Sequence, residues 1–137
     1  MNNITIQEQF KLPSNGLVYQ AKVNPIVHLR SMTTAEEMRR LQPSDSPYWT
    51  ICSIIDDCGA LDSGISSYDM CLGDYQYLLY MLRVVTHGSN YQIVNNCPYC
   101  KSETKETVLL DELDVLEYTP DLDKYKEFDL PKSGSHI

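Results

Sequence analysis

A run of three helices in the middle of the chain constrains its fold most strongly, because residues that start and stop helices bound each of them. The first helix is predicted to begin at Thr33 or Thr34, where residues 34–37 (Thr-Ala-Glu-Glu) match a capping box. Pro43 ends it, since proline cannot continue the hydrogen bonding of a helix. These helices are the strongest local signals in the sequence.

The second and third helices also show which of their faces is buried. The second has Ser46 as its N-cap and Pro47 at its first helical position, and Gly59 ends it. Its apolar residues recur at helical spacing and so share one face: Ile51, Ile54, Ile55 and Cys58. The third is predicted to open at Asp74 and to close at Gly88, with an inner face made of Tyr75, Leu78, Leu79, Leu82 and Val85. These faces predict a three-helix core.

Short extended segments flank the helices on both sides. Before them, Leu17–Val23 and Ile26–Arg30 are predicted to form an N-terminal β-hairpin, and Asn24-Pro25 divides the two strands. After them, Tyr91–Val94 and Thr104–Leu110 are predicted to form a second hairpin. The expected fold class is therefore α+β, with an N-terminal β-hairpin, a three-helix core and a C-terminal β-hairpin.

The two ends of the chain are poor in core-forming residues. Residues 1–15 are expected to form an extended arm, residues 16–117 the α+β domain, and residues 118–137 an acidic tail. The segment 9–16, with its Phe-x-Leu-Pro motif, recurs loosely as 127–134. Either this similarity is chance, or the tail leads into a second, related module of which only the start is present.

Composition and charge exclude several functional classes. The 137 residues carry a formal net charge of −8, which disfavours binding to nucleic acid or to anionic membranes. No segment approaches the ~20 apolar residues of a membrane helix, and the first ten residues lack the pattern of a signal peptide. We therefore expect synthesis in the cytoplasm. The ten tyrosines favour burial against partner proteins, because tyrosine combines a large contact area with a polar tip.

The only motif with a chemistry of its own is Cys97-Pro98-Tyr99-Cys100, a knuckle at the tip of the predicted hairpin 90–110. Two thiolates on a tight turn can point at one tetrahedral Zn²⁺, as in a zinc ribbon. A complete site needs four ligands, and no second Cys-x-x-Cys follows. The missing ligands would have to come from elsewhere in the chain, and the candidates are His87, Cys71, Cys58 and Cys52.

Other readings of the knuckle stay open: a reduced turn that only shapes the hairpin, an iron–sulfur cluster, or a redox dithiol. A thioredoxin-like site is disfavoured, because a strand-like segment follows the cysteines where that site needs a helix. Five cysteines, an odd number, fit reduced thiols or a metal site better than a disulfide framework.

Catalytic sites are also disfavoured. The three histidines, His28, His87 and His136, are scattered, and none lies in a recognisable nucleophile setting. Asp56 and Asp57 are adjacent, so on a helix their side chains diverge by about 100° and do not form an acid pair. The six glycines are dispersed at turns and form no phosphate-binding loop. We expect no enzymatic activity and no small-molecule ligand.

The succession of motifs along the chain resembles that of the T4-type baseplate hub-assembly proteins of contractile-tailed bacteriophages. In that family, a proline–glycine turn leads to two helices with characteristic residues and then to a hairpin with a CPxC motif. The resemblance spans roughly residues 10–116, and the segments that carry it are Phe10–Gly16, Val27–Glu37, Ile51–Cys58, Tyr77–Arg83, His87–Tyr91 and Cys97–Cys100.

The resemblance implies a structural or assembly role in the baseplate of a phage tail, at the hub or the inner wedge. Its partners would be other baseplate or tail proteins, and it would be located in the virion after synthesis in the host cytoplasm. We expect the arm 1–15 and the acidic segment 111–130 to make the contacts, because both are poor in core-forming residues. The alternative function is a zinc-ribbon adaptor that binds a cellular protein.

Overall fold

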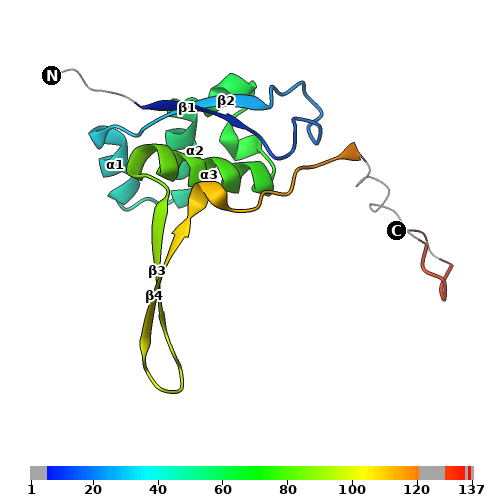
Figure 1. Ribbon diagram of the computed structural model, residues 1–137. Coiled ribbons are helices and arrows are strands. Elements are labelled where there is room, and N and C mark those ends of the chain that lie inside the picture. The colour runs from blue at the N-terminus through cyan, green and yellow to red at the C-terminus, as the bar shows by residue number, and fades with distance from the viewer. Residues whose placement is uncertain (1–5, 121–128, 135, 137) are drawn as a thin grey trace.

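The computed structural model describes residues 6–120, 129–134 and 136 of the chain. It has the α+β fold that the sequence predicts, with two small antiparallel sheets and three α-helices (Figure 1). The helices are α1 (Thr34–Leu41), α2 (Pro47–Asp57) and α3 (Leu72–His87). In the described part of the chain, no helix has both the length and the apolar character needed to cross a membrane.

The N-terminal hairpin exists, but its first strand is not the predicted one. Strand β1 (Gln7–Lys11) pairs with β2 (Ile26–Arg30), and Phe10 lies opposite Val27. The predicted strand Leu17–Val23 is instead part of the loop that joins them. Residues 7–11 of the segment expected to be an extended arm are therefore built into the sheet.

The loop between β1 and β2 is anchored to the start of α3 by one of its own side chains. The Tyr19 hydroxyl donates a hydrogen bond to Asp74 Oδ2 (2.5 Å), which draws the loop toward the start of α3. Asn15 and Gly16 have φ angles of 55° and 70°, which turn the chain in the left-handed region before Leu17. Tyr19 therefore anchors this segment to helix α3, and the segment does not pair as a strand.

The helix ends follow the predicted signals with small shifts. At α1 the N-cap is Thr33: its hydroxyl accepts the Glu36 N–H, and Glu36 Oε2 accepts the Thr33 N–H (2.8 Å). The capping box thus lies one residue before the predicted one. Helix α3 begins at Leu72, before the predicted Asp74, because the Asp74 side chain is buried against the β1–β2 loop and does not cap the helix.

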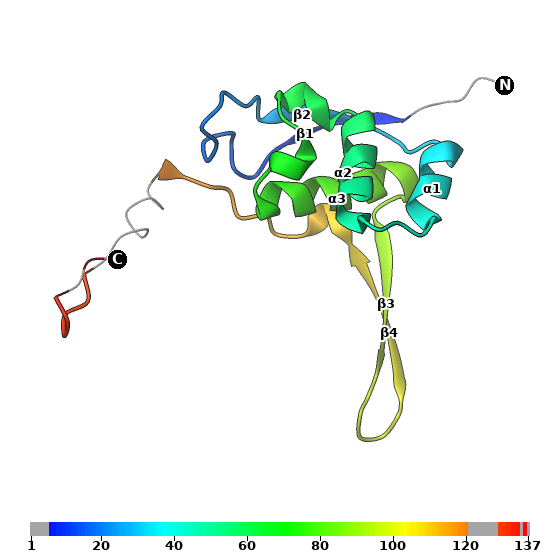
Figure 2. The same cartoon turned by 180° about the vertical axis from the view of Figure 1, so that it is seen from behind.

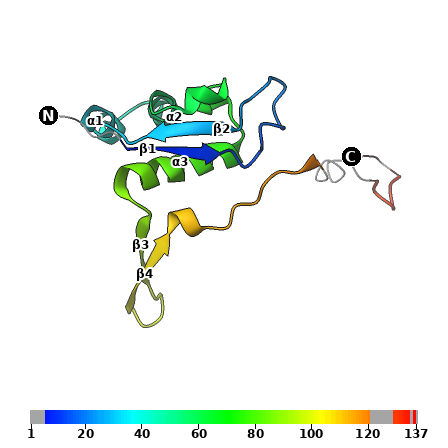
Figure 3. The same ribbon diagram turned by 45° about the horizontal axis from the view of Figure 1, so that its top comes forward.

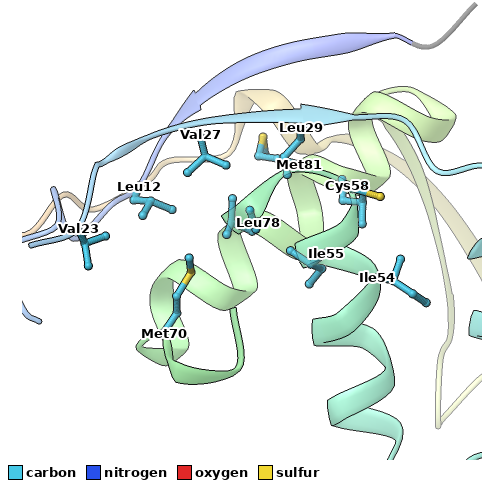
Figure 4. Packing of buried hydrophobic residues seen from close by; sticks show 12 residues of the cluster. Leu12, Val23, Val27, Leu29, Ile54, Ile55, Cys58, Met70, Leu78 and Met81 are labelled. Carbon is cyan, nitrogen blue, oxygen red and sulfur yellow. The ribbon is translucent and has the colours of Figure 1, made fainter. Parts of the chain in front are cut away.

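The core lies between the β1–β2 sheet and helices α2 and α3. Val27 and Leu29 alternate along β2 and point at the helices, as Figure 4 shows. The helices supply most of the rest of the cluster, including Ile54, Ile55, Cys58, Leu78, Met81 and Leu82. Each such side chain contributes about 1.5–3 kcal/mol by leaving water, so this small cluster holds the two layers together.

The connection after α2 passes against β2 at very short range. The Arg30 N–H donates to the Cys58 carbonyl oxygen (2.9 Å), and the next residue, Gly59, has a φ of 127°. A Cβ atom at position 59 would collide with the His28 carbonyl oxygen. Glycine is therefore required here both for its conformation and for its lack of a side chain.

The second hairpin projects away from the rest of the domain. Strands β3 (Asn90–Asn96) and β4 (Glu103–Leu109) leave the body where α3 ends, and in all three views they extend from it as a two-stranded ribbon (Figures 1, 2 and 3). Ile93, Val108 and Leu109 are its only partly buried strand residues. This hairpin confirms the predicted one, with the strands extended by one or two residues at most of their ends.

After β4 the chain returns along the body to the N-terminal turn. The Tyr118 N–H donates to the Pro13 carbonyl oxygen (2.7 Å), and Asn15 Nδ2 donates to the Tyr118 carbonyl oxygen (3.0 Å). The two segments expected to make external contacts therefore contact each other. Residues 121–128 of the predicted tail lie outside the described residues, and the second module stays a prediction.

Candidate assembly surface

The Cys97–Cys100 motif forms a closed turn at the far end of the β3–β4 hairpin. The Cys97 N–H donates to the Ser102 carbonyl oxygen (2.9 Å), and the Lys101 N–H donates to the Cys97 carbonyl oxygen (3.0 Å). Lys101 has a φ of 61°, a left-handed conformation that lets the chain reverse within these few residues. Cys100 is exposed and Cys97 is half-buried, so both thiols can be reached from solvent.

The environment of the tip favours the thiolate form of Cys100. Its Sγ lies 3.0 Å from the Ser102 hydroxyl, and this hydrogen bond lowers the pKa of the Cys100 thiol to about 7, with smaller contributions from the backbone and from Cys97. A thiol with this pKa is about half ionised at neutral pH. Thiolates are the reactive form of cysteine and its metal-binding form.

Two of the candidate zinc ligands, Cys52 in α2 and Cys58 at its C-cap, do not reach this tip. Cys52 and Cys58 are each 1% exposed and lie in the core. Burial, followed by the nearby carboxylate of Glu36, raises the pKa of the Cys58 thiol to about 12, so this thiol stays protonated. Both side chains act as small apolar residues of the core.

The two remaining candidate ligands are also held elsewhere. Cys71 is the N-cap residue of α3, where its Sγ lies 3.4 Å from the Tyr19 hydroxyl. His87 lies in the last turn of α3, and its Nε2 is 2.7 Å from Glu37 Oε1. Among residues 6–120, 129–134 and 136, no group of three or more His, Cys, Asp or Glu side chains is placed to hold a metal ion. A zinc-ribbon knuckle completed within the chain is therefore not supported.

The residues weighed for catalysis have structural partners. The Asp56 carboxylate accepts hydrogen bonds from the Ser66 hydroxyl (2.5 Å) and the Ser67 N–H (2.8 Å), and so fixes the turn after α2. Asp57 instead pairs with Arg39 at 2.7 Å on the surface. The three histidines stay apart, near Asp62 (His28), Glu37 (His87) and Asp129 (His136).

An apolar groove of about 670 Å³ lies where α2, α3 and the root of the β3–β4 hairpin meet. Its lining is mostly aliphatic or aromatic and includes Met32, Ile51, Leu79, Tyr80, Ile93, Val108 and Leu113. Tyr80 and Leu113 are 46% and 44% exposed, so the groove is open to a partner. The groove was not predicted from the sequence, because its lining comes from elements that are distant along the chain.

Basic side chains lie beside the groove in an otherwise acidic chain. Arg83 lies over the Tyr91 ring, 4.9 Å from its centroid, and its Nη1 donates to the Gly88 carbonyl oxygen (3.1 Å). In the part of the chain that the structure describes, Arg83 has no carboxylate partner. Arg40 does have one, since it pairs with Glu37 at 2.9 Å. The groove thus combines apolar walls with one uncompensated guanidinium group.

Two buried polar clusters, which sequence reasoning also missed, stabilise the body. Asp74 is fully buried and accepts hydrogen bonds from Ser14 and Tyr19. Arg30 forms two hydrogen bonds with the Glu36 carboxylate, which lower the pKa of Glu36 to about 2 despite partial burial. Both clusters join distant segments in the folded domain, and neither opens onto the groove or the cysteine tip.

Comparison with known proteins identifies the family. The family model described as T4 bacteriophage base plate protein matches residues 3–134, nearly the whole chain. No curated protein and no solved structure matches the chain. The match agrees with the resemblance carried by the individual motifs, and it extends over both hairpins and all three helices. The chain therefore belongs to this family and is a T4-type baseplate protein.

Proposed function

We propose that this protein acts by protein–protein docking during assembly of a contractile phage tail, at the hub or the inner wedge of the baseplate, and that it has no catalytic role. The observation that carries the proposal is the open apolar groove at the root of the projecting β3–β4 hairpin. A groove of this kind is suited to hold an apolar segment of a neighbouring subunit, and the hairpin beside it extends the contact surface.

Several large apolar side chains are exposed on the surface of the domain. In the lining of the groove, Tyr80, Tyr91 and Leu113 are each more than two-fifths exposed; outside it, Val94 is 49% and Leu116 93% exposed. Single exposed apolar residues are common, but a group around a groove is typical of an interface. Tyrosine and arginine, which are enriched at such interfaces, are both present here.

Charge indicates which partner segment would fit. Arg83 carries a positive charge next to apolar walls, and the chain as a whole carries −8. A partner segment with apolar side chains and a carboxylate next to them would complement the groove, whereas a basic segment would leave Arg83 unpaired. The expected occupant is therefore an apolar, acidic segment of another baseplate protein.

The structure also changes which segments we expect to make contacts. Leu12 is fully buried, and β1 is a strand of the sheet, so residues 7–12 are needed for folding. Of the acidic segment, Leu116 remains exposed between the groove and the Tyr118–Pro13 contact. The docking surface is therefore centred on the groove, the hairpin and Leu116.

The proposal can be tested in the phage that encodes this chain. A phage that lacks the gene should produce tails without complete baseplates by electron microscopy, and the gene supplied in trans should restore them. Normal particles from the deletion phage would contradict a role in assembly. That result would favour the alternative of an adaptor for a cellular protein.

The groove itself can be tested with a matched pair of variants. Y80E/L113E places two charges in the groove, and L72E places one on an exposed residue (67%) at the opposite end of α3. Complementation should fail with the first variant and succeed with the second, while both proteins keep wild-type circular dichroism. Complementation by the folded Y80E/L113E variant would rule out the groove as the docking site.

A further inference from the structure

We propose that two copies of this chain share one Zn²⁺ between the tips of their β3–β4 hairpins, with Cys97 and Cys100 of each copy as the four ligands. The inference is separate from the docking role of the groove, which it neither requires nor supports. It depends on three observations: the form of the tip, the positions of the other candidate ligands, and the charge of the hairpin.

The tip has the form of half a zinc site. Cys97 and Cys100 lie on one turn closed by two backbone hydrogen bonds, and Tyr99 between them is 94% exposed. Nothing in the described part of the chain covers the tip, so another molecule can approach both sulfur atoms. Structural zinc sites are tetrahedral with Zn–S distances of about 2.3 Å, and one Cys-x-x-Cys supplies two of the four corners.

The chain cannot bring its own remaining candidate ligands to this tip without unfolding. His87 is the nearest along the chain, but β3, with its seven residues, separates it from Cys97 by a span of about 23 Å. Cys52 and Cys58 are both buried, and moving Cys58 would open the cluster shown in Figure 4. Among the residues that the structure describes, no third or fourth ligand lies at the tip, and we therefore place these ligands on a second molecule.

A second copy of the same chain supplies the missing set. Two tips related by a two-fold axis place four thiolates around one point, and each copy contributes the same two residues. The resulting Cys₄ set is a common structural zinc site. Because the tips lie at the far ends of the projecting hairpins, they can meet without contact between the bodies (Figure 3).

Charge favours contact between copies at the hairpin rather than elsewhere. Residues 90–109 contain two lysines, Lys101 and Lys105, and two glutamates, Glu103 and Glu106, so the hairpin is neutral and the −8 of the chain resides in the rest. The negatively charged domains of two copies repel each other, whereas their neutral hairpins do not. Four thiolates around one Zn²⁺ leave a charge of −2, and Lys101 follows Cys100 in each copy.

The test is a metal titration of the purified, reduced, metal-free protein with zinc alone. Native mass spectrometry should show a doubling of mass with one zinc per two chains, and a chelator should restore the monomer. Titration with Co²⁺ should give the visible absorption spectrum of a tetrahedral tetrathiolate site, with saturation at half an equivalent.

Cysteine variants identify the ligands. C97S and C100S should remain monomeric in zinc, while C71S, which removes an exposed cysteine on the body, should dimerise like the wild type. The exposed tip makes little contact with the core, so all three should keep wild-type circular dichroism. A monomer with one bound zinc, a protein that binds no zinc, or zinc-dependent dimers of C97S/C100S would each overturn the proposal.

Discussion

Ser14 and Asp74, sixty residues apart in the sequence, meet through two hydrogen bonds in the interior of the domain. The Ser14 hydroxyl donates to Asp74 Oδ2 (2.5 Å), and the Ser14 N–H donates to Oδ1 (3.0 Å). Tyr19 donates to the same carboxylate, and burial, followed by this hydrogen bond, raises the pKa of the tyrosine. One carboxylate thus ties the N-terminal turn and its loop to the first turn of α3.

Replacement of Asp74 should destabilise the domain strongly. In D74A, the buried Ser14 hydroxyl and backbone N–H and the half-buried Tyr19 hydroxyl lose this acceptor, at a cost of about 2–4 kcal/mol in the free energy of unfolding. Urea unfolding measures this loss. Q76A, on the exposed face of the same turn, should change stability little, and equal stability of the two variants would contradict this role for Asp74.

The two glycines Gly59 and Gly73 should respond oppositely to alanine. G59A forces a Cβ against the His28 carbonyl oxygen at a φ of 127°, so it should lower the free energy of unfolding by about 2–4 kcal/mol or prevent folding. Gly73 lies in α3, and a Cβ there meets nothing within 4 Å. G73A should raise stability by up to about 1 kcal/mol. Thermal unfolding compares the two, and similar losses in both would refute the close approach at Gly59.

Acid should remove the contribution of Glu36 to stability. Because the Arg30 hydrogen bonds lower the pKa of Glu36 to about 2 in the folded protein, the carboxylate stabilises the fold above its usual pKa of 4.5. This contribution is lost as the pH falls from about 4.5 toward 2. At pH 7, E36Q should lower the free energy of unfolding by about 1.5–3 kcal/mol.

The pH dependence of the free energy of unfolding distinguishes the contribution of the Arg30–Glu36 pair from the effect of protonating other carboxylates. The stability difference between wild type and E36Q, measured by urea unfolding from pH 7 to pH 3, should shrink as the pH falls below about 4.5. E112Q, a change at an exposed carboxylate, serves as the control and should track the wild type throughout. A difference that does not depend on pH would argue against the Arg30–Glu36 pair.

The cysteines should differ sharply in reactivity in the metal-free protein. Iodoacetamide at about pH 7 should modify Cys100 first, because Ser102 lowers the pKa of this exposed thiol to about 7. Cys58 should react only on unfolding, since burial raises the pKa of its thiol to about 12. Peptide mass spectrometry gives the order of modification, and S102A should slow the reaction of Cys100. Early modification of Cys58 would show that the core opens.

Elements that depend on local signals could be predicted from the residues that bound them. The starts of α1 and α2 depend on Thr33 and Pro47, and the ends of α2 and α3 on Gly59 and Gly88. The cysteine turn was predicted as well, because a two-stranded ribbon with its tip needs only neighbouring residues. The order of these motifs also carried the resemblance to the baseplate family that the family match confirms.

Contacts between segments that are distant along the chain could not be predicted from the sequence. Leu17–Val23 is predicted as a strand, yet β1 takes its place beside β2, and Tyr19 of that segment instead donates a hydrogen bond to Asp74 of α3. The candidate ligands Cys52 and Cys58 follow an apolar helical pattern, and burial of that helix face removes them from Cys97. The groove likewise exists only where α2, α3 and the hairpin meet. Local backbone chemistry can be read from neighbouring residues, whereas a contact between remote side chains depends on how whole elements pack.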